Sequence, residues 1–165
     1  MTTTKDSAVM TLPSDTRILI TRRFAAPPRL VYRVLTEPDL IARWWAGKRG
    51  TVTSVDVDLR AGGNWRYAME SDGMVIAFRG TYREIVPDER IVFTEIYQSG
   101  SGATDEEPGV LCTYTLTANA DGTTLDLLTE TPDKATRDII AGSGMETGVQ
   151  EGMNIIDELV AELAA

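Results

Sequence analysis

The absence of histidine from the 165 residues limits the acid–base, nucleophilic and metal chemistry that this sequence could carry out. Histidine is the commonest general base and transition-metal ligand, and its absence excludes every Ser-His or Cys-His nucleophile. Catalysis would have to depend on carboxylates, Tyr, Lys or Arg. No acidic spacing indicates a metal site, so we expect neither metal nor cofactor. The single cysteine, Cys112, is expected to be a buried, inert core residue.

Among the carboxylates, Glu95 has the most unusual predicted position. It shares strand parity with Ile91 and Phe93, so its side chain should point to the apolar side of a sheet. Burying an unpaired carboxylate is costly, so Glu95 should form an ion pair or lie at a wet cavity mouth. Arg66 or Arg79 could be the partner. A structural ion pair is favoured; a polar ligand anchor and an acid/base catalyst, which would need a shifted pKa, stay open.

The stretch "EPDLIARWWAGKRG" places Trp44 and Trp45 side by side, before a glycine-bounded basic loop. Adjacent side chains on a helix point about 100° apart, so the two rings cannot share one apolar stripe. As a bare pair they are typical of core packing, since large aromatic side chains dominate protein cores. The sequence around them therefore raises the question of what the second ring faces.

Composition indicates a single domain. The chain is 42% hydrophobic and carries a formal net charge of -9, which argues against nucleic-acid and membrane partners. It has no apolar run of the roughly 20 residues that a bilayer requires and no signal-peptide pattern at its start, so a cytoplasmic location is expected. We expect a flexible N-terminal arm over residues 1–15 and one domain over residues 16–165.

The order of elements predicts the fold class. A strand is expected over residues 17–24, then two short helices within residues 28–45, then six strands between residues 51 and 130. The acidic segment at residues 98–109 should be a solvated loop. A short helix after Thr131 and a long amphipathic helix over residues 145–163 end the chain. Gly148 and Gly152 in the long helix permit close approach of another backbone.

These elements favour an α+β fold in which a curved antiparallel sheet of seven strands wraps the long C-terminal helix. Both apolar faces are buried in this arrangement. Few large side chains lie near the two glycines, so a cavity is expected between sheet and helix. Gly80, within a strand, should mark a gap or a bend.

Five motifs carry a resemblance to a known family. They are "ITRRFAAPPRLVYRVLTEPDLIARWW", "DLRAGGNWRYAM", "GTYREIVPDERIVFTE", "DGTTLDL" and "SGMETGVQEGMNIIDEL". In this order they resemble the activator-of-heat-shock-ninety-ATPase homologue-like domain, within the START-like, helix-grip (SRPBCC, birch-pollen-allergen-like) superfamily. The resemblance implies the helix-grip fold, with the two short helices closing one end of a cavity that receives an apolar or amphipathic molecule. It also suggests that one tryptophan packs beneath the sheet while its neighbour lines or lids the cavity. Trp45, which is nearer the loop, is predicted to be the lid.

The predicted cavity residues follow from strand alternation and from the resemblance. Alternation gives inward aromatic positions on several strands, and the long helix supplies Val149 and Met153, where many relatives carry bulkier side chains. Core packing without a ligand remains the plainer interpretation for most of these positions. The candidate ligand-binding residues are Trp45, Trp65, Tyr67, Phe78, Tyr82, Phe93, Glu95, Tyr114, Val149 and Met153.

Three functions remain open from the sequence. The favoured one is binding or carrying a small apolar or amphipathic molecule without chemistry. The second is a cyclase- or aromatase-like enzyme that holds a flexible hydrophobic substrate, with Tyr67, Tyr82, Glu95 and Arg66 as candidates. The third is a partner-binding module of co-chaperone type, which the single domain disfavours. A homodimer is a further possibility.

Overall fold

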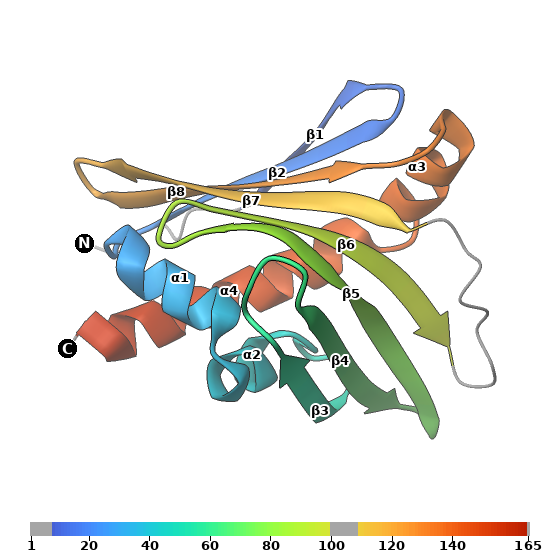
Figure 1. Cartoon of the computed structure of the whole chain (residues 1–165), viewed down its shortest axis with the longest axis horizontal. Coiled ribbons are helices and arrows are strands. Elements are labelled where there is room, and N and C mark those ends of the chain that lie inside the picture. The colour runs from blue at the N-terminus through green and yellow to red at the C-terminus, as the bar shows by residue number, and fades with distance from the viewer. Residues whose placement is uncertain (1–7, 100–108, 165) are drawn as a thin grey trace.

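The computed structural model describes residues 8–99 and 109–164. The predictions for the first seven residues of the arm and for the acidic segment around residues 105–107 lie outside these ranges. The described chain forms one antiparallel sheet with helices against one of its faces (Figure 1).

The sheet contains eight strands in the order β1-β2-β8-β7-β6-β5-β4-β3. Every neighbouring pair is antiparallel, and the consecutive strands from β3 to β8 form a meander. The last strand of the meander, β8, pairs with β2. The strands are β1 Val9–Ser14, β2 Arg17–Phe24, β3 Thr51–Val57, β4 Asn64–Ser71, β5 Met74–Val86, β6 Arg90–Ser99, β7 Val110–Asn119 and β8 Gly122–Glu130.

The fold class is confirmed, but the predicted number of strands is one too few. The additional strand, β1, falls in the segment that was assigned to the flexible arm, and it pairs with β2 through Val9↔Thr21 and Met10↔Ile20. Five of its six residues are exposed, so β1 has no buried apolar face. Alternation between apolar and polar residues is the signal that identifies a half-buried strand, and β1 lacks it.

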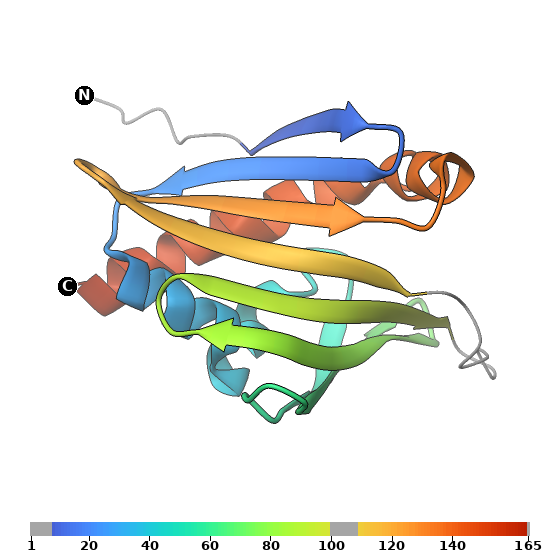
Figure 2. The ribbon, with the colours of Figure 1, turned by 45° about the horizontal axis from the view of Figure 1, so that its top comes forward.

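Four helices complete the described part of the chain, namely α1 Pro28–Thr36, α2 Pro38–Trp44, α3 Lys134–Ala141 and α4 Met145–Ala164. The long helix α4 runs along one face of the sheet, and Figure 2 shows it passing behind the strands. Helices α1 and α2 lie beside it on the same face (Figure 1). None of the described helices is long and apolar enough to cross a membrane.

The two halves of α4 pack differently against the rest of the protein. In the C-terminal half, Ile156, Leu159 and Val160 are buried in a core shared with β2 and α1. In the N-terminal half, Met145 and Val149 are only partly buried. The helix is therefore held tightly at one end, while its first turns leave space against the sheet.

A buried arginine that sequence analysis did not single out joins α4 to β2. Arg22 points inward from β2 and is 1% exposed. Its guanidinium donates a hydrogen bond to Asn154 Oδ1 at 2.9 Å and lies 3.9 Å from Asp157 Oδ2. It also lies over the ring of Phe24. Buried charges require partners, and Asn154 and Asp157 supply them from α4, so this contact joins the helix to β2.

Candidate functional site

A cavity of about 1150 Å³ lies between the sheet and the N-terminal half of α4. Side chains of β4 to β8 form one wall, and α3, α4 and the segment around Trp45 form the other. Ligand pockets in proteins usually measure about 300–1,000 Å³ and are mainly apolar, so this cavity is large enough for a substantial small molecule.

The structure places all ten predicted residues on the cavity wall. Seven of the ten come from the strands β4 to β7, two from α4, and one from the residue that follows α2. They are Trp65, Tyr67, Phe78, Tyr82, Phe93, Glu95 and Tyr114 on the strands, Val149 and Met153 on α4, and Trp45 after α2. Contact of these residues with a ligand stays a prediction.

The tryptophan pair divides its contacts between the helices and the cavity. The Trp45 ring centre lies 5.6 Å from those of both Tyr67 and Phe78, in edge-to-face geometry. Trp44 packs on α4 instead, and its indole N–H donates to the carbonyl oxygen of Val34 at 2.8 Å. Both residues line the cavity, and the role of Trp45 as a lid stays a prediction. Trp45 covers the aromatic side of the cavity, as a lid would.

The glycines of α4 allow the segment after α2 to dock closely, as the sequence predicted. A Cβ atom on Gly152 would lie 3.3 Å from the Trp44 carbonyl oxygen, and one on Gly148 would lie 2.9 Å from the Arg49 guanidinium. The backbone N–H of Lys48 donates to Glu151 Oε1 at 3.3 Å. These contacts hold Arg49 at the edge of the cavity, where the residue is exposed.

Glu95 begins a polar row that crosses three neighbouring strands inside the cavity. The Cys112 thiol donates to Glu95 Oε2 at 3.8 Å, and the Cys112 sulfur lies 3.9 Å from Thr129 Oγ1. Cys112 is buried as predicted, at 2% exposure. Thr129 is its register partner on β8. The row places a carboxyl, a thiol and a hydroxyl side by side on an otherwise apolar wall.

The predicted ion pair of Glu95 with Arg66 or Arg79 is wrong. These two arginines are register partners on β4 and β5, and each lies next to a cavity-lining residue in its strand. Successive side chains in a strand point to opposite faces, so both arginines lie on the face away from the cavity. Within the described part of the chain, Glu95 takes part in no ion pair.

Burial sets the protonation of the cavity groups. It raises the pKa of Glu95 to about 7, against a smaller lowering by the hydrogen bond from Cys112. Burial also raises the pKa of Tyr82 to about 12 and raises those of Tyr67 and Tyr114 strongly, with Glu95 adding to both. The three phenols are therefore neutral hydrogen-bonding groups near neutral pH, and only Glu95 titrates there.

The cavity wall offers little for metal or nucleophilic chemistry. No group of three or more Cys, Asp or Glu side chains among the described residues is placed to hold a metal ion. Burial raises the pKa of the Cys112 thiol well above its ordinary value, so the nucleophilic thiolate is disfavoured. The arrangement is suited to holding a molecule by apolar contact and a few hydrogen bonds.

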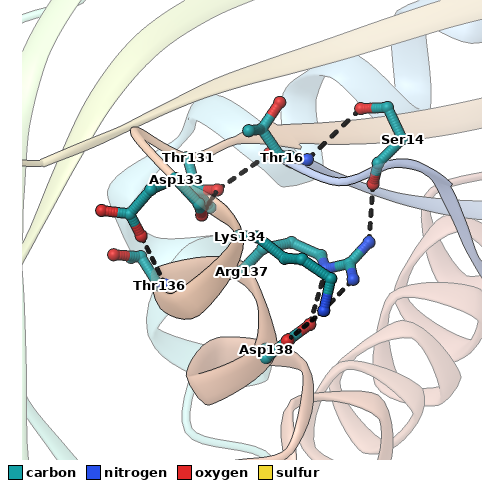
Figure 3. A network of polar contacts seen from close by, with 8 residues as sticks. All are labelled: Ser14, Thr16, Thr131, Asp133, Lys134, Thr136, Arg137 and Asp138. Atoms are coloured by element: carbon teal, nitrogen blue, oxygen red, sulfur yellow. Dashed lines mark hydrogen bonds and ion pairs between the residues drawn. The ribbon is translucent and has the colours of Figure 1, made fainter.

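Helix α3 closes one end of the cavity and is fastened to the turn between β1 and β2. The Arg137 guanidinium donates to the Ser14 carbonyl oxygen at 2.6 Å and to Asp138 Oδ1 at 2.8 Å (Figure 3). Asp133 caps the helix by accepting a hydrogen bond from the Thr136 backbone N–H at 2.7 Å. Thr136, Ile139 and Ile140 of this helix then face the cavity. Sequence analysis missed these residues, although Asp133 before a helical segment is a capping signal.

We expect Arg137→Ala to lower the free energy of unfolding by about 2 kcal/mol, because it removes charge-assisted hydrogen bonds and leaves the Ser14 carbonyl without its donor. Urea unfolding followed by circular dichroism measures this change. Lys134→Ala is the matched control, since it removes only an exposed ion pair with Asp138 and should cost less than about 0.5 kcal/mol. Equal effects of the two variants would contradict the anchoring role of Arg137.

The fold and the cavity together define a class of proteins. A curved antiparallel sheet that clasps a long C-terminal helix, with short helices near the N-terminus, is the helix-grip architecture of the SRPBCC superfamily. Residues 25–161 match the sequence profile of the family described as "Activator of Hsp90 ATPase homolog 1-like protein". The chain belongs to this family.

Solved bacterial structures resemble most of the chain. A crystal structure of a Rhodobacter sphaeroides protein has a TM-score of 0.86 at 26% identity, covering 95% of this chain and 99% of that one. A Chromobacterium violaceum protein has a TM-score of 0.74 at 28% identity, with 88% and 97% covered. A Mycobacterium smegmatis protein has a TM-score of 0.82 at 23% identity, with 93% and 96% covered, and supports the fold alone. No curated protein matches the sequence significantly.

Proposed function

We propose that this protein binds a small apolar or amphipathic molecule inside the cavity between the sheet and α4. The observation that carries the proposal is the cavity of about 1150 Å³ with its largely aromatic and aliphatic wall. Filling such a space with an apolar molecule removes apolar surface from water, which contributes roughly 25 cal/mol for each Å². The helix-grip family to which the chain belongs is consistent with this role.

The rim of the cavity supports entry of an apolar molecule. Ile139 on α3 is 72% exposed and Tyr97 on β6 is 45% exposed, and both also line the cavity. Exposed apolar side chains gathered at a pocket opening are typical of binding sites.

Binding is favoured over catalysis by what surrounds Glu95. Many acid–base mechanisms pair a base with a second group that titrates near the operating pH. On the described cavity wall the phenols stay protonated, and the other charged side chain, Arg49, lies at the exposed edge. One carboxyl among neutral groups is better suited to anchoring a ligand than to shuttling protons.

The neutral dye N-phenyl-1-naphthylamine, which fluoresces in apolar surroundings, tests the proposal. Wild-type protein should bind it saturably at one site. Val149→Trp should weaken binding by about tenfold or more, because the larger side chain projects from α4 into the cavity and displaces the dye. Thr147→Trp, which adds the same ring at an exposed position of α4, should leave binding unchanged. Absence of saturable binding, or equal binding by the two variants, would refute a ligand in this cavity.

A further inference from the structure

We infer that the ligand is an amphiphile whose polar end donates a hydrogen bond to the Glu95 carboxyl. This polar end is a hydroxyl or a protonated amine, and the cavity discriminates against carboxylates. The inference rests on the proposed function and adds the chemical class of the ligand. It is carried by the placement of Glu95 on the cavity wall and by the charges around it.

The Glu95 carboxyl has hydrogen-bonding capacity that the protein leaves unused. A carboxylate has about four acceptor positions on its two oxygens. Among the described residues, Glu95 receives one hydrogen bond, from the Cys112 thiol at 3.8 Å, and a thiol is a weak donor. The residue is only partly buried and lines the cavity, so its oxygens remain accessible from inside. A ligand hydroxyl or ammonium placed there would supply the missing donor.

The charges around Glu95 oppose an anionic ligand. Across the cavity, α4 contributes apolar side chains such as Val149 and Met153 and no basic group to the wall. The only basic side chain on the described wall is Arg49, which is exposed and lies against Gly148 at the edge. A carboxylate that entered the cavity would face a like charge in a medium that screens poorly. A protonated amine would instead form a charge-assisted hydrogen bond.

The neighbouring phenols explain why a hydroxyl group also fits. Tyr67, Tyr114 and Glu95 line the same cavity, and the negative charge of Glu95 adds to the rise in the pKa of each phenol. A ligand hydroxyl in that region can donate to Glu95 and accept from a phenol at once. A carboxylate could accept from the phenols but would still meet Glu95.

Displacement of N-phenyl-1-naphthylamine by decylamine, decanol and decanoate tests this inference, since the three share one alkyl chain. At about pH 8.5, Glu95 is mostly ionised. There we expect the affinity of the protein to decrease in the order decylamine, decanol, decanoate, with a difference of about tenfold or more between decylamine and decanoate. Glu95→Gln should weaken the binding of decylamine about tenfold and change the affinity for decanol by less than about threefold. Glu95→Asp keeps the charge and should retain the preference for the amine.

The controls separate this inference from the proposed function. Asp56→Asn removes one negative charge from an exposed position on β3 and should leave the order and the affinities unchanged. If the dye binds but decanoate displaces it as well as decylamine does, or Glu95→Gln does not change the order, the ligand class is wrong and the binding function stands. If the dye itself does not bind, the proposed function is refuted, and the inference about the ligand class fails with it.

Discussion

Replacing Glu95 by Gln should raise the free energy of unfolding by up to about 3 kcal/mol at pH 8. Burial raises the pKa of the Glu95 carboxyl from 4.5 to about 7, so the folded protein at pH 8 holds a charge that its surroundings do not stabilise. The difference of about 2.5 pKa units corresponds to about 3 kcal/mol, at 1.36 kcal/mol for each unit. Gln keeps the shape and carries no charge, so the variant avoids this cost.

The same carboxyl determines how the stability of the wild type depends on pH. Between about pH 4.5 and pH 7 the folded state binds more protons at Glu95 than the unfolded state, so the free energy of unfolding falls as pH rises. It should therefore be higher at pH 5 than at pH 8 in the wild type and nearly equal at both in Glu95→Gln. Urea unfolding of ligand-free protein at both values measures the difference, because a bound ligand would itself stabilise the fold.

Other titrating groups do not produce this pattern. Hydrogen bonds from Thr136 lower the pKa of Asp133, and Lys134 and Arg137 lower that of Asp138, so their stabilisation is lost only at pH values below the ordinary aspartate range. Asp56→Asn, at an exposed position, should leave the wild-type pH profile intact. A wild type equally stable at pH 5 and pH 8, or a Glu95→Gln variant less stable than wild type at pH 8, would contradict the burial of an unpaired carboxyl.

Gly80→Ala should destabilise the protein by more than about 3 kcal/mol, because a Cβ atom at this position has no space. The added carbon would lie 1.7 Å from the Thr94 carbonyl oxygen and 2.9 Å from the Trp65 indole nitrogen. That indole donates to the same Thr94 oxygen at 3.1 Å, crossing β5 where Gly80 has no side chain. Alanine would therefore push apart the backbones of β5 and β6 and break this hydrogen bond.

Thermal and urea unfolding of Gly80→Ala measure the loss, and Gly142→Ala provides the comparison. Gly142 ends α3 with an ordinary negative φ of -88°, and its nearest contact for an added Cβ is 3.2 Å. We expect that change to cost less than about 1 kcal/mol. If Gly80→Ala is as stable as the wild type, the hydrogen bond from the Trp65 indole does not depend on a glycine at this position. The close approach of β5 and β6 at this point would then not be required for the fold.

The inward and outward positions of the central strands could be predicted from the sequence, because alternation on a half-buried sheet has a period of two. It placed Glu95 correctly on the cavity side. The same alternation puts Arg66 between the inward residues Trp65 and Tyr67, so the signal against an ion pair with Arg66 was present. The register between strands was not predictable, because it depends on pairing among distant segments. The contact between Glu95 and Cys112 depends on that register.

Features without an apolar pattern were missed. Strand β1 is recognisable only through its pairing with β2, and the hydrogen bond from Arg137 to Ser14 joins residues 123 positions apart in the sequence. Arg22 lies on the buried face of β2, a position where alternation predicts an apolar residue. Its burial depends on Asn154 and Asp157 of α4, and no local pattern indicates partners from so distant a segment.

The most direct test of a ligand held between the sheet and α4 is an isotope-filtered nuclear Overhauser experiment on labelled protein with bound unlabelled N-phenyl-1-naphthylamine. We predict contacts from dye protons to the methyl groups of Val149, Met153 and Leu127, which line the cavity from both walls. Contacts confined to exposed side chains such as Val75 and Leu12 would show that the dye rests on the outside of the protein and would contradict an internal binding site.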